Sequence, residues 1–362
     1  MRICIVLPCN IYTAPFFNKY VEILASNKYE FDLIYWNRAG IKEETHAKCS
    51  YSFNMKDKVN SGNFFKIYKY IKFSLFTKKI LRENKYDRVL ILGSYAGIMA
   101  QLALFMSNNY NNRYWLDIRD YTFENVEIYS KMMKVAIENS FATAVSSPGY
   151  KKFLPEWNYI QTHNVDFKNI QKIKSLEKVE HKKIRISFIG LVRYYDQNIK
   201  LLEAFKNSKE VILQYFGMNS DYLQEYCKLN NITNVEFHGR FEPSETPFFY
   251  SRTDVINNIY GNTGIELTTA LSNKLYYAAG SNIPILVSQG TMMSDISTEF
   301  VFGYTVDLDD EKLAENIINW YKNLDIEQLN RGCENFMNQV VKDEKNFEKK
   351  LLDFLSNDGG VK

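Results

Sequence analysis

Short apolar runs that end at tight turns recur along this chain, and they constrain its fold more than any other feature of the sequence. The run Ile3–Leu7 shows no alternation with polar residues and ends at Pro8, as a strand buried on both faces of a parallel sheet does. Similar runs follow at 31–36, 88–92, 114–117 and 142–146, with helical patterns between them. Strands that alternate with helices form βαβ units, so the first half predicts a doubly wound parallel sheet.

The second half repeats this alternation, with strand-like runs at 185–189, 211–216, 235–238, 254–259 and 283–287. Between 167 and 183 polar residues replace apolar ones, which favours a linker there. The sequence therefore predicts an α/β protein of two Rossmann-like domains, with these parts: a first domain at 1–167, a linker at 168–183, a second domain at 184–337 and a C-terminal helix at 338–362. Apolar residues at helical spacing in the last part suit a helix that packs back on the first domain.

Composition narrows the function classes. The chain has 362 residues, of which 46% are hydrophobic and 24% charged, as in an ordinary globular protein. Its 45 Lys and Arg against 42 Asp and Glu argue against a nucleic-acid partner. Five dispersed cysteines without a CxxC pair predict neither a disulfide framework nor a zinc site. The first apolar run is too short for a signal peptide, so we expect a cytoplasmic protein.

Two basic side chains of the second half are candidates for binding an anionic ligand. Ligands of open parallel sheets bind beyond the carboxyl ends of the strands, and two such domains that face each other across a cleft suit a ligand with a central diphosphate. Arg193 follows the turn at Gly190 and offers a bidentate fork. Lys274 lies in the first turn of a helix capped by Ser272 or Asn273, where a cation opposes the helix dipole unless an anion binds there. On local grounds, a solvated first-turn residue explains Lys274 equally well, and an arginine after a strand is more often a surface residue than a ligand.

The second half resembles the donor domain of GT-B glycosyltransferases, in particular the retaining family-4-like enzymes of bacterial surface polysaccharide synthesis. The resemblance rests on an ordered series of short motifs: Phe188-Ile189-Gly190 with Arg193, Tyr215-Phe216-Gly217, residues 235–239, residues 250–255, Asn273-Lys274-Leu275 and residues 284–287. In the first half, residues 115–120, 144–147 and 164–166 are similar to the acceptor domain of that family. Each motif is short, and the specificity lies in their order.

The resemblance implies a hexosyltransferase that moves a sugar with retention from a nucleotide-diphosphate donor to a lipid-linked or oligosaccharide acceptor, in capsule or other cell-surface polysaccharide synthesis. Arg193 and Lys274 would hold the diphosphate, helped by Gly190 and by backbone N–H groups between Ser272 and Leu275. No metal and no other cofactor is expected. The sequence Asp307-Leu308-Asp309 spells a metal-binding DxD, but we assign it to the capping of a helix that begins near Glu311.

The chain departs from the family pattern at two positions. Asp196 stands near the place of a lysine that often follows the arginine, and Tyr277 replaces a glutamate that usually binds the ribose. Tyr277 lacks the two acceptor oxygens of a carboxylate, which puts nucleotide binding in question. Glu266 follows a glycine-containing loop that in this family faces the sugar, and it is a candidate substitute acid. A solvated loop residue is the equal alternative.

Acceptor-side candidates lie in the first half. Asp117 and Asp120 flank Arg119 directly after a strand, where they could meet an acceptor hydroxyl or form a structural clamp with the arginine. Asn10 follows the first strand and is a candidate for contact with the sugar; a simple turn is the alternative. His238, at a strand end, is expected to be structural.

Residues 64–85 carry seven Lys and Arg against one acid, interleaved with aromatic and aliphatic residues. Such a helix binds the interface of anionic membranes, and the alternative is a helix packed on the sheet with solvated lysines; both can hold together. We therefore expect peripheral attachment to the inner face of the cell membrane.

The sequence also allows functions other than that of a glycosyltransferase. A partner subunit that keeps the fold but has lost donor binding is one alternative, and a nucleotide-sugar 2-epimerase of the same fold is another. The epimerase needs several acids and bases in its site, which four histidines in 362 residues disfavour. A two-lobed solute-binding protein is the weakest rival because no export signal is recognised.

Overall fold

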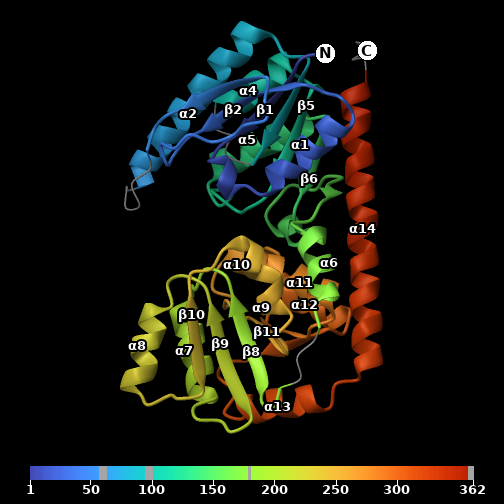
Figure 1. Cartoon of the computed structure of the whole chain (residues 1–362). Helices are drawn as coiled ribbons and strands as arrows, with labels where there is room; N and C mark the ends of the chain where they lie inside the picture. The colour runs from blue at the N-terminus through green and yellow to red at the C-terminus, as the bar shows by residue number, and fades with distance from the viewer. Residues whose placement is uncertain (57–62, 94–100, 178–180, 358–362) are drawn as a thin grey trace. The chain divides into compact units, whose positions relative to one another are not determined.

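The computed structural model describes residues 1–56, 63–93, 101–177 and 181–357 (Figure 1). The chain forms two compact units. The first contains residues 1–163 together with 342–362, and the second contains residues 164–341. Each unit is built on one parallel sheet with helices on both of its faces. The predicted α/β fold with two doubly wound domains is confirmed.

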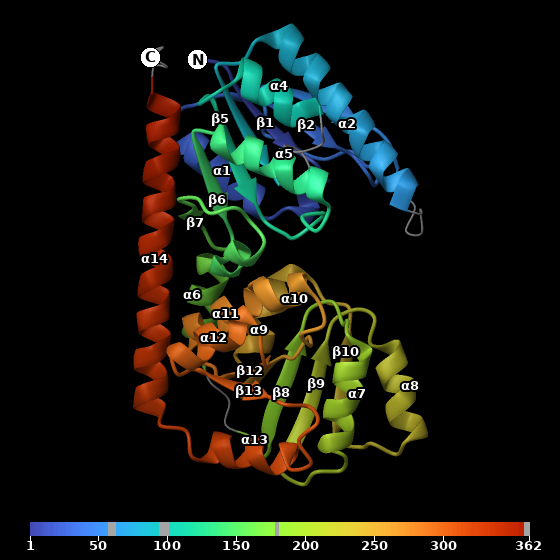
Figure 2. The same cartoon turned by 180° about the vertical axis from the view of Figure 1, so that it is seen from behind.

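The sheet of the first unit has seven strands in the order β3-β2-β1-β4-β5-β6-β7. Its strands are β1 (Ile3–Leu7), β2 (Phe31–Trp36), β3 (Cys49–Phe53), β4 (Arg88–Leu92), β5 (Tyr114–Ile118), β6 (Ala142–Val145) and β7 (Ile160–Gln161). Helices α2 (Asn63–Asn84), α4 (Gln101–Asn109) and α5 (Glu127–Glu138) cover one face, while α1 (Phe16–Ser26) lies on the other (Figures 1 and 2). The short 3-10 helices η1 (Ile11–Thr13) and η2 (Pro148–Lys152) lie in loops. The strand order reverses between β1 and β4.

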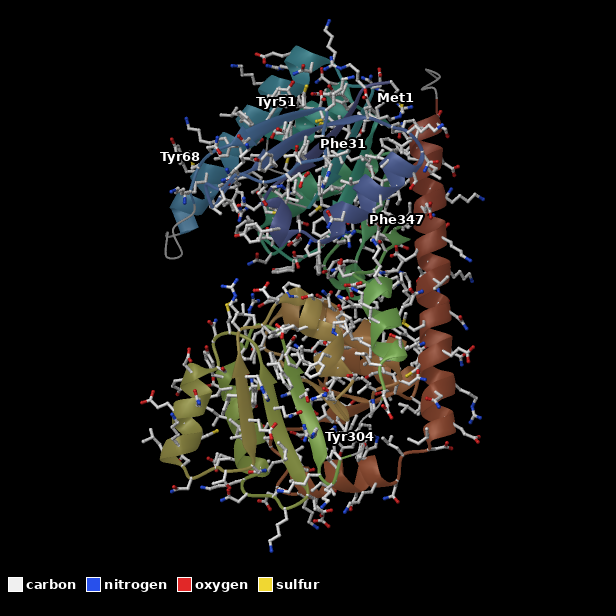
Figure 3. The ribbon with its side chains drawn as sticks, in the orientation of Figure 1. Met1, Phe31, Tyr51, Tyr68, Tyr304 and Phe347 are labelled. Carbon is white, nitrogen blue, oxygen red and sulfur yellow. The ribbon has the colours of Figure 1, made fainter. Side chains whose placement is uncertain are left out.

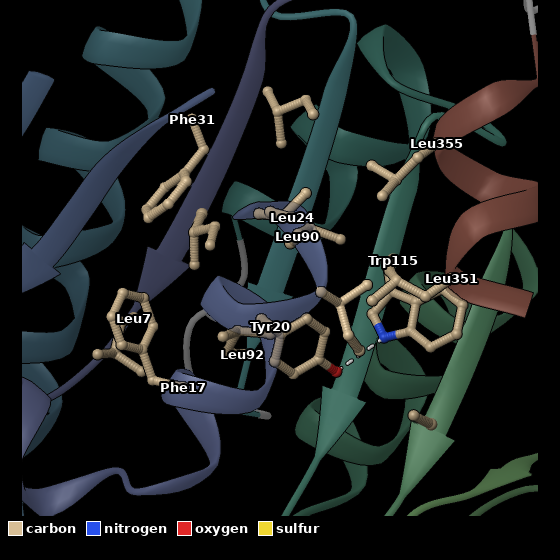
Figure 4. Close-up of a cluster of buried hydrophobic side chains, with 14 of the residues drawn as sticks. Leu7, Phe17, Tyr20, Leu24, Phe31, Leu90, Leu92, Trp115, Leu351 and Leu355 are labelled. Atoms are coloured by element: carbon tan, nitrogen blue, oxygen red, sulfur yellow. Dashed lines mark hydrogen bonds between the residues drawn. The ribbon is translucent and has the colours of Figure 1, made fainter. Parts of the chain in front are cut away.

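The last helix, α14 (Ile326–Ser356), contributes to both cores. Its end packs into the first unit, where the ring of Phe347 makes edge-to-face contacts with Tyr20 and Trp115, each at 5.5 Å between centroids. Trp115 Nε1 also donates to the Tyr20 hydroxyl at 3.1 Å (Figure 4). The helix begins before the predicted position 338, because Leu329, Cys333, Phe336 and Val340 are buried in the second unit at helical spacing.

The sheet of the second unit has six strands in the order β10-β9-β8-β11-β12-β13. Its strands are β8 (Ile184–Ile189), β9 (Val211–Phe216), β10 (Val235–Gly239), β11 (Val255–Asn258), β12 (Ile285–Ser288) and β13 (Gly303–Val306). Its helices are α6 (Phe167–Ser175), α7 (Tyr195–Ala204), α8 (Asp221–Leu229), η3 (Pro243–Glu245), α9 (Thr246–Tyr250), α10 (Ile265–Thr269), α11 (Asn273–Ser281), α12 (Met292–Glu299) and α13 (Leu313–Lys322). One buried cluster lies under α7, α8 and α13, and another under α6, α11 and α12. The order reverses between β8 and β11, the kind of point where ligands bind.

Helix α6 corrects the predicted linker at 168–183. Asp166 caps this helix by accepting from the Asn169 amide at 3.0 Å, and Ile170 and Ile173 are buried in the second unit. Gly280 of α11 permits the contact, since a Cβ there would lie 2.7 Å from Ile170 Cδ1. Two apolar residues among lysines gave too weak a pattern for the sequence to reveal the helix.

Two glycines meet where β8 and β9 end. Gly190 and Gly217 have φ of +127° and +141°, a region that side chains disfavour. A Cβ on Gly217 would lie 1.8 Å from the carbonyl oxygen of Gly190. The close approach of the two loops therefore depends on glycine at 217.

Replacing Gly217 with alanine is expected to lower the free energy of unfolding by about 3 kcal/mol, because backbone must move to admit the methyl group. Gly239→Ala is the matched control: Gly239 has φ of +62°, but a Cβ there has no atom within 4 Å. This control should lose only about 1 kcal/mol, the cost of left-handed backbone. Urea denaturation compares the two, and equal midpoints would contradict the steric argument.

Candidate functional site

A cavity of about 400 Å³ opens at the carboxyl ends of the strands of the second unit. Six of the predicted site residues line it: Gly190, Arg193, Ser272, Asn273, Lys274 and Tyr277. The other lining residues are Ile189, Leu191, Tyr194, Phe241, Thr246, Tyr250 and Tyr260. Because the cavity is lined by this unit alone, its chemistry follows from the loops after β8, β10 and β11 and from the start of α11.

Lys274 is the most constrained cation of this pocket. Ser272 caps α11 by accepting from the Lys274 amide at 3.2 Å, which settles the predicted choice between Ser272 and Asn273. The Lys274 side chain is only 6% exposed. Its Nζ donates to the Tyr260 hydroxyl at 2.6 Å and lies 3.8 Å from the ring centroid of Phe188. Burial of this kind is unlike that of a solvated first-turn lysine.

Arg193 approaches the same pocket from the loop between β8 and α7. The Asn198 amide holds this loop by donating to the carbonyl oxygens of Arg193 and Tyr194, at 2.8 and 3.0 Å. The arginine side chain is exposed. In the part of the chain that the structure describes, neither Arg193 nor Lys274 forms an ion pair with a carboxylate. The pocket thus carries two positive charges that no acid neutralises.

Backbone N–H groups at the start of α11 contribute less than predicted. The Leu275 amide donates to the Ser272 carbonyl at 3.0 Å, and the Leu275 side chain is fully buried in the core, outside the pocket. The Lys274 amide is used by the cap. Among the described residues, the Asn273 amide is the one of these three without a partner. One backbone N–H group at this helix end therefore has no partner among the described residues.

Aromatic rings form the opposite part of the pocket lining. The rings of Tyr250 and Tyr277 stack with centroids 4.5 Å apart and planes 27° apart. The Tyr277 hydroxyl donates to Asp166 at 3.3 Å. Burial and this neighbouring carboxylate raise the pKa of Tyr277 to about 12, so its phenol is neutral near pH 7. The position where the family carries an acid thus presents an uncharged ring.

Tyr260 is the pocket residue that sequence reasoning missed. Burial alone would raise its pKa, but the adjacent Lys274 ammonium, hydrogen bonds from Lys274 and Ser272, and the charge of Arg193 together lower the pKa below its usual value. Tyr260 comes soon after the last residue of β11. Its place beyond the carboxyl end of a central strand was the available signal.

Glu266 is not brought into this pocket. It is exposed in the first turn of α10, and its carboxylate folds over Gly264, where a Cβ would lie 2.6 Å from Oε1. Asp196 is likewise exposed, in the first turn of α7, where an acid suits the helix dipole. Both positions match solvated residues.

The acceptor-side candidates of the first unit have structural partners. Asp117 is fully buried, and its Oδ2 accepts from the Tyr20 hydroxyl and from Arg119, each at 2.7 Å. Asn10 is 2% exposed; its amide donates to Asn37 and Glu43, at 3.0 and 2.5 Å, and its carbonyl oxygen accepts from the Ala39 amide at 2.9 Å.

Their roles as acceptor ligands are therefore corrected. Asp117 forms an ion pair with Arg119, which is the structural alternative given above. Asn10 connects the loop after β1 to the loop after β2 through its hydrogen bonds. Asp120 is exposed and stays a candidate.

The Asp307–Asp309 segment shows no metal-site geometry. Asp307 accepts from the Asp309 amide at 3.0 Å, and Asp309 pairs with Lys200. The predicted capping role is wrong, because α13 starts later than predicted, at Leu313, and has no side-chain cap among the described residues; Asp310 accepts from the Lys312 amide at 2.9 Å just before it. Within the described ranges, no three His, Cys, Asp or Glu side chains gather as metal ligands would. That the chain needs no metal stays a prediction.

Comparison with known proteins was made at three levels. No family model and no curated protein matches the chain. Solved structures do match: sucrose-phosphate synthase from Thermosynechococcus elongatus has a TM-score of 0.68 at 12% identity and covers 94% of each chain. A glycosyltransferase from Rickettsia africae has a TM-score of 0.65 at 13% identity, over 98% of this chain and 99% of that one. Anabaena HepE, solved with UDP, has 0.68 at 12%, over 98% and 100%. The likeness shows that the chain has the GT-B fold.

Replacing Asp117 with asparagine is expected to lower the free energy of unfolding by about 3 kcal/mol, because the buried guanidinium of Arg119 loses the carboxylate with which it forms an ion pair. Asp120→Asn removes the neighbouring exposed carboxylate and should change stability by less than about 0.5 kcal/mol. Thermal and urea denaturation measure both. A stable Asp117→Asn variant would show that the clamp is not what keeps an acid at this position.

Proposed function

We propose that this GT-B chain is a glycosyltransferase whose donor is a nucleotide-diphosphate sugar, with the diphosphate bound by Arg193 and Lys274. The observation that carries the proposal is the presence of both cations in one pocket, without a carboxylate partner among the described residues. Taking an ammonium out of water costs several kcal/mol, and a phenol oxygen and a ring face offset only part of that cost. An anionic ligand supplies the missing charge.

A diphosphate fits the other features of the pocket. The free Asn273 amide adds a donor at a helix N-terminus, and Gly190 leaves room, since a Cβ there would lie 3.9 Å from Lys274 Nζ. A volume of about 400 Å³ is within the range of small-molecule sites. Anabaena HepE, which shares the fold, was solved with UDP and with UDP and glucose. This analogy supports a hexosyl nucleotide as donor.

The reaction that suits this arrangement is hexosyl transfer with retention. The bond between the anomeric carbon and the diphosphate oxygen breaks, and the acceptor hydroxyl oxygen forms the new glycosidic bond on the same face of the sugar. The hydroxyl proton passes to a phosphate oxygen of the leaving group. Arg193 and Lys274 stabilise the negative charge that grows on the diphosphate, which is why we expect no metal.

The two alternative functions, an epimerase and a partner subunit without donor binding, predict different pocket residues. An epimerase needs acids and bases beside the sugar, but no Asp, Glu or His is among the described residues that line this cavity. A partner subunit without donor binding would have no reason to keep an unneutralised pair of cations. The pocket therefore favours the transferase over both rivals.

The cations are tested by nucleotide binding. At one hundred times its dissociation constant, the best ligand of a panel of nucleoside diphosphates should stabilise the wild-type chain by about 2.7 kcal/mol in a thermal-shift assay. Lys274→Met and Arg193→Ala should each weaken binding by about 100-fold, the loss typical of a charged donor to an oxyanion.

The control for this experiment is Lys206→Ala, which removes an exposed cation of the same unit outside the pocket. It should bind the nucleotide as the wild type does. If no nucleoside diphosphate stabilises the wild-type chain, or if all three variants bind equally, the donor assignment is wrong.

Helix α2 supports a membrane-bound acceptor. Ile67, Ile71 and Leu75 lie four residues apart, on one side of the helix, and are 41–42% exposed. Tyr68, which is labelled on α2 in Figure 3, directly follows Ile67 and is 47% exposed. Two basic residues, Lys72 and Lys79, are exposed near them, while Lys78 and Arg82 lie over the ring of Phe105 in α4. Buried residues on the other side, including Phe73, Ile80 and Leu81, pack against the unit. Of the two sequence interpretations, sheet packing therefore holds for one side of the helix, which leaves the other side available to lipid.

No described helix has the length and apolar character needed to cross a bilayer. We propose that the exposed side of α2 attaches the chain to anionic lipids at the inner face of the cell membrane, where a lipid-linked acceptor for surface polysaccharide synthesis would lie. Apolar contact and basic charge on one helix side are the two contributions that such binding requires.

Flotation with vesicles tests the membrane proposal. The wild-type chain should float with vesicles that contain phosphatidylglycerol and remain below with pure phosphatidylcholine. Because each basic residue near an anionic surface contributes about 1 kcal/mol, Lys72→Glu with Lys79→Glu should reduce binding by at least about 30-fold. Lys131→Glu with Lys134→Glu makes the same charge change on α5 and should bind nearly normally. Equal flotation of both double variants would overturn the assignment of α2.

A further inference from the structure

The hydroxyl group of Tyr260 accepts a hydrogen bond from Lys274 and still has its own proton to donate. On the basis of the proposed function, we propose that Tyr260 is a further ligand of the diphosphate: its oxygen accepts from Lys274 while its proton is donated to a phosphate oxygen. Tyr260 would then be both a positioning residue for the lysine and a direct contact of the anion.

The tyrosine ring is fixed by its neighbours. Its centroid lies 5.0 Å from that of Tyr194 and 6.1 Å from that of Phe188. Lys274 Nζ lies 2.6 Å from the Tyr260 oxygen and 3.8 Å from the Phe188 centroid. Two rings therefore hold the hydroxyl where it meets the ammonium, at the lining of the cavity.

The direction of the hydrogen bonds follows from the chemistry of the groups. An ammonium can only donate, so the Tyr260 oxygen must accept from Lys274. A tyrosine hydroxyl has one proton, and in the described part of the chain no acceptor receives it. The remaining direction is the cavity, where the proposed phosphate oxygens would accept it.

The electrostatic surroundings strengthen this donor. Lys274 and Arg193 overcome the effect of burial and lower the pKa of Tyr260, and a more acidic phenol donates a stronger hydrogen bond to an anion. The geometry also explains why phenylalanine would not suffice here. It would keep the ring contacts but leave the lysine without its oxygen partner and the phosphate without a donor.

Titration calorimetry of Tyr260→Phe tests the inference, with the tightest nucleoside diphosphate of the panel, its parent nucleoside and inorganic pyrophosphate as probes. We expect the diphosphate and pyrophosphate to bind about tenfold more weakly or worse, because a hydrogen bond to a charged group is lost. The nucleoside, which carries no phosphate, should bind the variant as it binds the wild type. A general distortion of the pocket would weaken all three.

Tyr215→Phe is the matched control. Tyr215 is 1% exposed in the same unit, its hydroxyl has no hydrogen-bond partner among the described residues, and its ring stacks on Phe188 at 6.1 Å between centroids. This variant also removes one buried phenol oxygen near Phe188, yet lies outside the cavity, and should bind every probe normally. Circular dichroism melting confirms that both variants fold.

A pH series provides a second readout that a purely structural role would not produce. Wild-type affinity for the diphosphate should fall as the pH rises through the lowered pKa of Tyr260, because the phenolate cannot donate and repels the anion. Lys274 and Arg193 also face this hydroxyl, and Tyr194 and Ser272 adjoin it, but Tyr260→Phe retains all four. The variant should therefore lack only the part of the pH dependence that comes from Tyr260.

The outcomes separate the two proposals. If wild type binds the diphosphate and Tyr260→Phe binds it equally well at every pH, the role of Tyr260 is wrong and the proposed function stands. If wild type binds neither pyrophosphate nor any nucleoside diphosphate, the proposed function itself is wrong. Weaker binding of the nucleoside together with the diphosphate would also overturn the inference, since it would indicate a structural effect.

Discussion

The pocket of the second unit depends on a buried lysine ammonium that has no acidic partner among the described residues. Lys274 is stabilised by the Tyr260 oxygen and by the face of Phe188, and both groups are positioned by strands β8 and β11. Gly190 leaves space beside the ammonium, and Gly217 allows the loop after β8 to adopt its course. The loops at this edge of the sheet are thus arranged around one desolvated charge.

The two units use buried charge in opposite ways. In the first, the charge of Asp117 is neutralised by Arg119, and Asp117 Oδ2 also receives a hydrogen bond from Tyr20. In the second, Lys274 has only neutral partners among the described residues. Burial is therefore common to both charges, and the presence of a counter-charge is what differs between them.

Local patterns explain which parts of the structure could be predicted. The buried strands, the Ser272 cap and the positions of Arg193 and Lys274 each depend on residues close in sequence. The partners of Asn10 lie far along the chain, at Asn37 and Glu43, so its structural role could not be predicted from the sequence. The pairing of Asp117 with the nearby Arg119 could be predicted as an alternative, but the contact with the distant Tyr20 could not. Tyr260 was missed because only the fold brings its hydroxyl to Lys274. Helix α6 was missed because the core that buries Ile170 and Ile173 is built mainly from residues more than a hundred positions later.

Helix α14 also determines when each unit can become complete during synthesis. Its first half supplies Leu329, Phe336 and Val340 to the core of the second unit, and its second half supplies Phe347, Leu351 and Phe354 to the core of the first. Residues 1–163 leave the ribosome early, but their apolar face stays uncovered until the last residues have been translated. The amino-terminal unit is therefore finished no sooner than the carboxyl-terminal one, and a nascent chain must keep that face from aggregating in the meantime.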